Sequence, residues 1–128
     1  MNHLTKLEHL ELYDNKISKI EGIDNLTEIK ILDLSFNNIF KIEGLQNIRK
    51  VKKLYLLSNR IKKIENLDNK EELEELELGS NKIKVMENLV NFPSLKTLVL
   101  AKNLIEEIQG LEFLSHIKVL NLTCNKIK

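Results

Sequence analysis

The sequence predicts an α/β solenoid, a curved right-handed coil with a parallel β-sheet on its concave face and short 3₁₀ or irregular turns on its convex face. Two observations lead to this prediction. The pattern LxxLxLxxN recurs every 22 residues without insertion or deletion, and each copy is followed by apolar positions three residues apart. A fixed period in this range is typical of repeat architectures, in which each unit stacks on its neighbours. The pattern opens at Leu7, Ile29, Val51, Leu73, Leu95 and Ile117.

The repeats run through the whole chain, so we predict a single domain over residues 1–128. No linker, low-complexity tract or charge block separates one repeat from the next. Partial repeats at both ends leave apolar positions uncovered, which suggests either a longer array or self-association through the ends. The full repeats are Leu7–Glu28, Ile29–Lys50, Val51–Glu72, Leu73–Ser94 and Leu95–His116.

The first part of each repeat alternates apolar and polar residues, as a half-buried strand does. In the fourth copy, Leu76 and Leu78 point towards the core. The residues between and after them, Glu75, Glu77 and Gly79, point to the other face. Because the copies arrive in the same direction, they can pair only as a parallel sheet with one strand per turn.

An asparagine closes every copy of the pattern. Its amide carries donors and an acceptor, so it can bridge backbone groups left unpaired where the strand turns away, and it can bond to neighbouring repeats. Leaving such a buried group unpaired costs about 1–3 kcal/mol. We therefore interpret this column as structural. Its members are Asn15, Asn37, Asn59, Asn81, Asn103 and Asn125.

The apolar positions after each asparagine are three residues apart, which fits short 3₁₀-like turns better than a long α-helix. One of these columns holds Ile20, Ile42, Ile64, Met86 and Ile108. Beside it runs a column of glycine and asparagine only, the residues that most readily accept a positive φ. We predict a left-handed backbone at Gly22, Gly44, Asn66, Asn88 and Gly110.

Lys70 breaks the pattern, because Ile48 and Phe92 hold the same inner position in the neighbouring repeats. We expect its aliphatic stem to lie on the core while its ammonium group reaches water. The stretch KEELEELEL, which begins at Lys70, looks helical by itself. The repeat overrides that local reading, since Leu76 and Leu78 occupy the strand positions of every other copy.

Composition and charge limit the possible location and partners. The formal net charge is +1, so bulk charge predicts attraction to neither nucleic acid nor a membrane surface. The one cysteine, Cys124, cannot form an internal disulfide, and no N-terminal apolar segment resembles a signal peptide. No apolar run approaches membrane-spanning length. We expect an intracellular soluble protein, in the nucleus and/or the cytoplasm.

Motifs for catalysis or cofactor binding are missing from the sequence. The histidines His3, His9 and His116 are scattered, and Cys124 has no partner at metal-ligand spacing. There is no phosphate-cradling glycine loop and no nucleophile elbow. The many carboxylates lie on an open sheet, which offers little to drive paired pKa values apart. We expect no enzymatic activity, no metal and no cofactor.

The outward strand positions form a predicted binding surface on the concave face. Acidic and aromatic residues gather there, whereas Lys53 is the only basic one. Such a mixture on a rigid sheet suits docking to a basic patch of another protein. The simpler alternative is an ordinary strand surface, where scattered apolar residues are normal. The central column holds Glu11, Asp33, Tyr55, Glu77, Val99 and Asn121.

A ridge of basic residues follows the asparagine column, and four glutamates lie close behind it. We interpret it as a solvated face rather than an RNA track, because Phe40 is its only interleaved aromatic residue. The basic residues are Lys16, Lys19, Lys41, Arg60, Lys62, Lys63, Lys82 and Lys84; the glutamates are Glu21, Glu43, Glu65 and Glu87.

The 22-residue unit LxxLxLxxNxIxxIxxLxxLxx resembles the intracellular leucine-rich-repeat subfamily named for a regulatory subunit of protein phosphatase 1. Three segments are similar to consecutive repeats of that subunit, including the non-structural positions YDN, SFN and GSN. They are LTKLEHLELYDNKISKIEG (Leu4–Gly22), LTEIKILDLSFN (Leu26–Asn37) and LEELELGSNKIKVMENL (Leu73–Leu89).

The resemblance implies a non-catalytic scaffold whose concave face grips the phosphatase catalytic subunit away from its metal site. Carried over by position, the contacts are Asp33, Tyr55 and Glu77. Val99 stands where the family has a phenylalanine, which diminishes that contact, and Glu11 lies in the same column. Family members have more repeats and a C-terminal cap, where further contacts lie.

Two other functions fit similar repeats. A spliceosomal leucine-rich-repeat protein has them too, and in a ribonucleoprotein subunit the RNA-facing element would be Lys62, Lys63, Lys82 and Lys84. That alternative predicts RNA binding that weakens steeply with salt. A scaffold associated with dynein or cilia is the other alternative.

Overall fold

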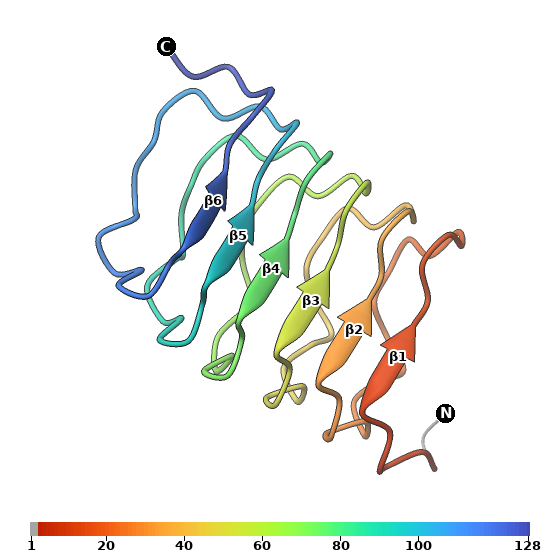
Figure 1. Ribbon diagram of the computed structural model, residues 1–128. Helices are drawn as coiled ribbons and strands as arrows, with labels where there is room; N and C mark the ends of the chain where they lie inside the picture. The colour runs from red at the N-terminus through yellow and green to blue at the C-terminus, as the bar shows by residue number, and fades with distance from the viewer. Residues whose placement is uncertain (1–2) are drawn as a thin grey trace.

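The computed structural model describes residues 3–128, which form a ribbon of six short parallel strands with the connecting segments behind it (Figure 1). The order of the strands in the sheet follows the chain, so the first and last strands lie at opposite ends of the ribbon. The predicted solenoid is confirmed; residues 1–2 of the predicted domain lie outside the described part. The strands are β1 (His9–Glu11), β2 (Ile31–Asp33), β3 (Lys53–Tyr55), β4 (Glu75–Glu77), β5 (Thr97–Val99) and β6 (Val119–Asn121).

Every strand pairs with the next in the register that the repeat predicts. Leu54 of β3 lies opposite Leu76 of β4, and Leu76 lies opposite Leu98 of β5. Neighbouring parallel strands are about 4.8 Å apart, so residues at equivalent repeat positions stack in straight columns. This stacking fixes which outward side chains lie next to one another on the concave face.

The inward-facing leucines of the strands form the core. Leu54, Leu56, Leu76 and Leu78 are fully buried, with exposed fractions of 0–1%. Each leucine buried in this way contributes about 1.5–3 kcal/mol relative to an exposed one. The strand residues therefore alternate as predicted, with apolar side chains inward and Glu75 and the other polar ones outward.

Short turns make up the convex side, as expected. The N–H of Leu26 donates to the carbonyl of Ile23 at 3.0 Å, and the same spacing of three recurs in later repeats. No helix occurs among residues 3–128. The isoleucine column in these turns is buried as far as Met86, but Ile108 is half exposed. Among residues 3–128, Ile108 is the last member of this column, and no further member packs on it.

The asparagine column forms a ladder that joins each repeat to the one before it. Asn81 donates from Nδ2 to Leu78, to Gly79 and, one repeat earlier, to Leu56, whose carbonyl is 2.9 Å away. Its Oδ1 accepts from the N–H of Ile61 at 2.9 Å. Asn37, Asn59, Asn103 and Asn125 repeat this pattern, which confirms the structural interpretation.

Two columns of the backbone have a positive φ. The predicted glycine and asparagine column is confirmed, with φ between 58° and 78° at all five positions. A second column, directly before the asparagine of each repeat, was not predicted. Its φ values lie between 53° and 58° at Asp14, Phe36, Ser58, Ser80, Lys102 and Cys124.

Lys70 differs from the prediction. The whole residue is buried, and its ammonium group does not reach water. Instead Nζ donates to the backbone carbonyls of Leu45 at 2.8 Å and Asp68 at 3.2 Å. The prediction was wrong because it overlooked these carbonyls, which take the place of water. Burial lowers the pKa of Lys70.

Candidate partner-binding site on the concave face

Three of the predicted contact residues lie around one hollow on the concave face. Asp33, Tyr55 and Glu77 are neighbours in register on β2, β3 and β4. They line a hollow of about 320 Å³. The other lining residues come from the flanking positions of β1 to β3 and the turns after them. They are Tyr13, Ser35, Phe36 and Leu57.

Both acids in the hollow are held by the backbone two residues further on. Asp33 accepts at Oδ1 from the N–H of Ser35 at 2.9 Å. Glu77 accepts at Oε1 from the N–H of Gly79 at 2.6 Å. One oxygen of each carboxylate is therefore fixed, and the other remains available for a partner's cation. Positioned acceptors of this kind lose little conformational freedom when they bind.

The environment of Glu77 disfavours its charge. Glu77 is partly buried, and the resulting desolvation raises the pKa of its carboxyl. The hydrogen bond from the N–H of Gly79 acts in the opposite direction and lowers this pKa. A cation of a partner protein would restore the favourable surroundings that the carboxylate lost on folding. The site thus gains from binding a positive group and gains nothing from binding a negative one.

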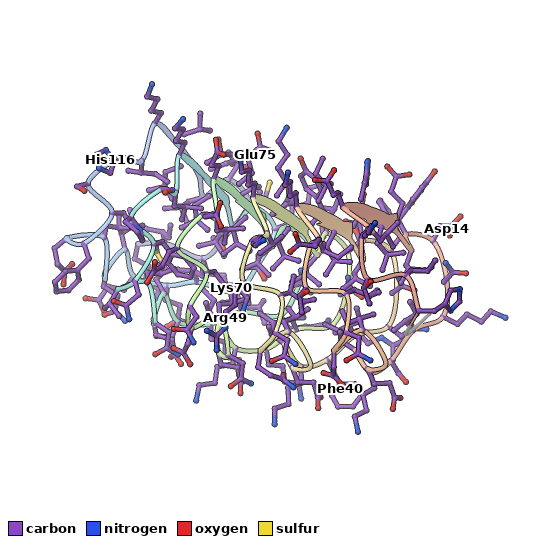
Figure 2. The ribbon with its side chains drawn as sticks, turned by 90° about the horizontal axis from the view of Figure 1, so that it is seen from below. Asp14, Phe40, Arg49, Lys70, Glu75 and His116 are labelled. Carbon is purple, nitrogen blue, oxygen red and sulfur yellow. The ribbon has the colours of Figure 1, made fainter. Side chains whose placement is uncertain are left out.

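The side chain of Tyr55 is hydrogen-bonded to Glu75, which lies in the outward column next to the central one. Its hydroxyl donates to Oε2 of Glu75 at 2.7 Å, and Figure 2 shows Glu75 on the sheet side of the molecule. Burial, this hydrogen bond and the nearby carboxylates raise the pKa of Tyr55 to about 12. The phenol therefore stays neutral, and its orientation is fixed before any partner arrives.

The two remaining predicted contacts lie in the same column but outside the hollow. Glu11 is exposed at the β1 end, where its Oε1 lies 3.0 Å from Nε2 of His9. Val99 pairs with Glu77 in register and is partly buried. All five partner contacts stay predictions.

Phe36 is the lining residue that sequence reasoning missed. Tyr13, Ser35 and Leu57 belong to an outward strand column, but Phe36 belongs to the turn after β2. Its side chain is 50% exposed. The available signal was a bulky aromatic residue directly before Asn37, where other repeats have small or polar residues. That signal becomes meaningful only once the positive φ of this position is known.

A larger hollow of about 730 Å³ opens at the edge where β3 to β6 begin. Lysines and glutamates both line it, and Nζ of Lys96 lies 3.6 Å from Oε1 of Glu74. Because groups of both signs line it, this hollow is less clearly suited to a cation than the concave one. The concave hollow, by contrast, has two acids and no basic lining residue.

The basic ridge is less neutralised than the sequence suggested. Among the eight cations, the described residues show an ion pair only for Lys63, whose Nζ lies 3.8 Å from Oε1 of Glu87. Residues 3–128 contain no group of three histidine, cysteine, aspartate or glutamate side chains arranged to hold a metal ion. The same stretch has no helix long and apolar enough to cross a membrane.

Stacked strands, an asparagine ladder and an open acidic face define a repeat solenoid of the kind that is typically a non-enzymatic binding scaffold. The family profile described as leucine-rich repeats (two copies) matches residues 5–47 and 71–112, and a leucine-rich-repeat profile matches residues 113–128. The chain belongs to the leucine-rich-repeat family. Proteins of this family bind protein partners generally.

Solved structures similar to this chain include two internalins of Listeria monocytogenes. Internalin inlF is 29% identical with a TM-score of 0.91, over 99% of this chain and 37% of that one. Internalin C2 is 25% identical with a TM-score of 0.89, over 95% of this chain and 54% of that one. A leucine-rich-repeat protein of Leptospira interrogans, at 23% identity and a TM-score of 0.89 over 97% of this chain and 33% of that one, shows the fold alone.

The chain therefore spans between about a third and a half of the length of these structures. A search of curated protein sequences finds no match.

Proposed function

We propose that this protein is a non-catalytic regulatory scaffold that binds the catalytic subunit of protein phosphatase 1 through its concave face. The observation that carries the proposal is the line of Asp33, Tyr55 and Glu77 around one hollow. These are the positions at which the repeat-specific resemblance implies phosphatase contacts. The proposal includes an intracellular location, in the nucleus and/or the cytoplasm.

The physical support comes from charge and from preorganisation. Two carboxylates and no basic residue line the hollow, so the face complements a basic patch. Their hydrogen bonds to Ser35 and Gly79 hold the acids in place before docking. A central aromatic residue such as Tyr55 typically contributes about 2 kcal/mol or more when it is buried at an interface.

The proposal is tested by measuring the affinity of the phosphatase catalytic subunit for the protein and for a double variant, Tyr55→Ala with Glu77→Lys. Calorimetric titration should show a loss of at least about thirtyfold, because an aromatic anchor is lost and a counter-charge becomes a like charge. Lys84→Glu is the matched control, since it reverses a charge on the ridge. Unchanged affinity of a folded double variant would contradict the proposal.

The basic ridge supports a second candidate, an RNA-binding subunit of a ribonucleoprotein. This candidate is supported by the small number of ion pairs along the ridge, since only Lys63 of its eight cations has one among the described residues. Single-stranded RNA should then bind with an affinity that falls steeply as salt rises, and Lys62→Glu with Lys84→Glu should abolish binding. Binding that is absent at low salt would remove this candidate.

A further inference from the structure

Phe36 occupies a backbone conformation that a phenylalanine rarely adopts. Its φ is 55°, in the left-handed region, where bulky residues are uncommon. Two other repeats have a serine there, Ser58 and Ser80, and the first has Asp14. The ring is also half exposed, so it contributes little to the core. Folding alone gives no reason for a phenylalanine at this position.

The solenoid imposes this conformation on every repeat, whatever the residue is. The N–H of Phe36 donates to the carbonyl of Leu57 at 2.8 Å. The N–H of Ser58 makes the same bond to Gly79 at 2.9 Å, one repeat later. The backbone at position 36 is thus fixed by the hydrogen-bonding pattern, and a serine satisfies that pattern as well. The side chain is free to serve another purpose.

The hollow beside Phe36 combines two kinds of surface. Tyr13, Phe36, Tyr55 and Leu57 supply aromatic and apolar surface, and Asp33 and Glu77 supply negative charge. Its volume of about 320 Å³ suits a single protruding side chain. It lies at the lower end of the roughly 300–1,000 Å³ typical of pockets for small ligands.

Arginine is the side chain that uses both surfaces. Its planar guanidinium stacks on aromatic rings and forms paired hydrogen bonds with carboxylates. Lysine carries a compact and strongly hydrated charge, which gains less from an aromatic neighbour. An apolar side chain would leave both acids without a counter-charge.

We propose that this hollow binds one arginine side chain of the partner protein, with Phe36 and Tyr13 as its aromatic side and Asp33 and Glu77 as its counter-charges. The inference rests on the concave-face docking of the proposed function. It adds the chemical identity of the docked group and makes Phe36 a determinant of specificity, a role that the repeat pattern does not assign.

The probe for the test is N-acetyl-arginine amide, titrated into the protein while NMR follows the ring protons of Phe36 and Tyr13. Saturable shifts are expected with this probe. Citrulline acetylated at its α-nitrogen, as the amide, has nearly the same shape without the charge. Lysine acetylated at its α-nitrogen, as the amide, has the charge but lacks the planar guanidinium group. Both are expected to give at most weak shifts. Equal binding of either one, or no saturable shift with arginine, would overturn the inference.

The variant Phe36→Ser has the residue that the next repeat has at this position, Ser58. It should therefore fold, with a melting temperature equal to or higher than that of the unaltered protein. Arginine binding is expected to weaken by about threefold or more. Phe40→Ser is the matched control, because Phe40 is also exposed, Ser18 holds the matching position one repeat earlier, and Figure 2 shows Phe40 on the side opposite the sheet. Phe36→Tyr keeps an aromatic ring and should restore binding. Equal effects of Phe36→Ser and Phe40→Ser would contradict the inference.

The same variants separate this inference from the proposed function. Phosphatase binding by the unaltered protein tests the proposed function, and the arginine probe tests whether the hollow binds arginine. If arginine binds as described and the phosphatase does not, the proposed function fails and the arginine site stands. If the phosphatase binds with equal affinity to Phe36→Ser and to the unaltered protein, the docking stands and the inference fails.

Discussion

The carboxylate of Glu77 lies in the space that a side chain at Gly79 would fill. The N–H of Gly79 donates to Oε1 of Glu77 at 2.6 Å, and a Cβ at position 79 would lie 2.7 Å from that same oxygen. It would also lie 3.2 Å from Cδ1 of Leu57. The φ of Gly79 is outside the left-handed region, so a side chain here would meet the Glu77 carboxylate without straining the backbone.

Gly79→Ala should therefore move the Glu77 carboxylate away from its place in the hollow. In solvent the carboxylate is less desolvated, so its pKa is expected to fall from its raised value towards 4.5. A carboxyl NMR titration measures this shift directly, and phosphatase affinity should fall with it. Ala101→Gly, the reverse change one repeat later in the same column, is the control. A raised pKa that persists in Gly79→Ala would show that the alanine is accommodated without displacing the acid.

Glu77→Gln should stabilise the protein at neutral pH. The folded state binds the Glu77 proton more tightly than the unfolded state does, since burial raises the pKa above 4.5. The contribution of this carboxyl to the free energy of unfolding is therefore fully present below pH 4.5, and it is lost as the pH rises through the raised pKa. Glutamine still accepts from the N–H of Gly79 but carries no charge. Melting temperatures at several pH values should show an advantage for glutamine at pH 7 that shrinks as pH falls towards 4.5. An advantage that grows on acidification would mean that the assigned direction of the shift is wrong.

Asn59→Ala should destabilise the fold by about 2 kcal/mol or more, since it leaves the N–H of Ile39 without its partner. It also removes one of the two asparagine bonds to each of the carbonyls of Leu34 and Leu56, which keep those from Asn37 and Asn81. Asn59 bonds to the carbonyls of Leu34 and Leu56 and accepts from the N–H of Ile39. Asn15→Ala is the matched control, because Asn15 is exposed and, within the described residues, its side chain bonds only to Leu12 and Tyr13 of its own repeat. Urea unfolding measures both. Equal losses for the two variants would remove the special role given to bonds between repeats.

Lys70→Met should make the protein more stable by about 1 kcal/mol or more, because an apolar side chain of similar length avoids burying a charge. The carbonyl of Leu45 keeps its bond from the N–H of Ile48 at 3.0 Å. The same change at the exposed Lys62 should alter the free energy of unfolding by less than about 0.5 kcal/mol. Chemical unfolding compares the two, and a destabilised Lys70→Met would show that the bonds of the ammonium group outweigh its desolvation.

Most of the fold follows from the sequence because each structural role is repeated. The strand register, the asparagine ladder and the positive φ at Gly44 and Asn66 all belong to columns whose residues share one structural preference. The left-handed backbone at Phe36 was missed because its column mixes aspartate, phenylalanine, serine, lysine and cysteine, so no residue preference marks it. The burial of the Lys70 ammonium group was not predicted, because no other repeat has a lysine at this position and its partners could not be inferred by comparison.

The candidate site divides in the same way. The line of Asp33, Tyr55 and Glu77 could be placed from register, since stacked strands put equal positions side by side. The hollow itself depends on side-chain contacts that cross columns, such as the bond from Tyr55 to Glu75. Periodicity within a column carries no information about such contacts.

Methyl NMR of the protein with the phosphatase catalytic subunit tests the central claim most directly, because the two faces carry separate reporters. Leu57 and Val99 lie on the concave face, and Val85 and Val90 are exposed in the turns. Concave-face docking predicts that the methyl signals of Leu57 and Val99 shift or broaden while those of Val85 and Val90 stay unchanged. Changes confined to Val85 and Val90, or no change at either face, would contradict it.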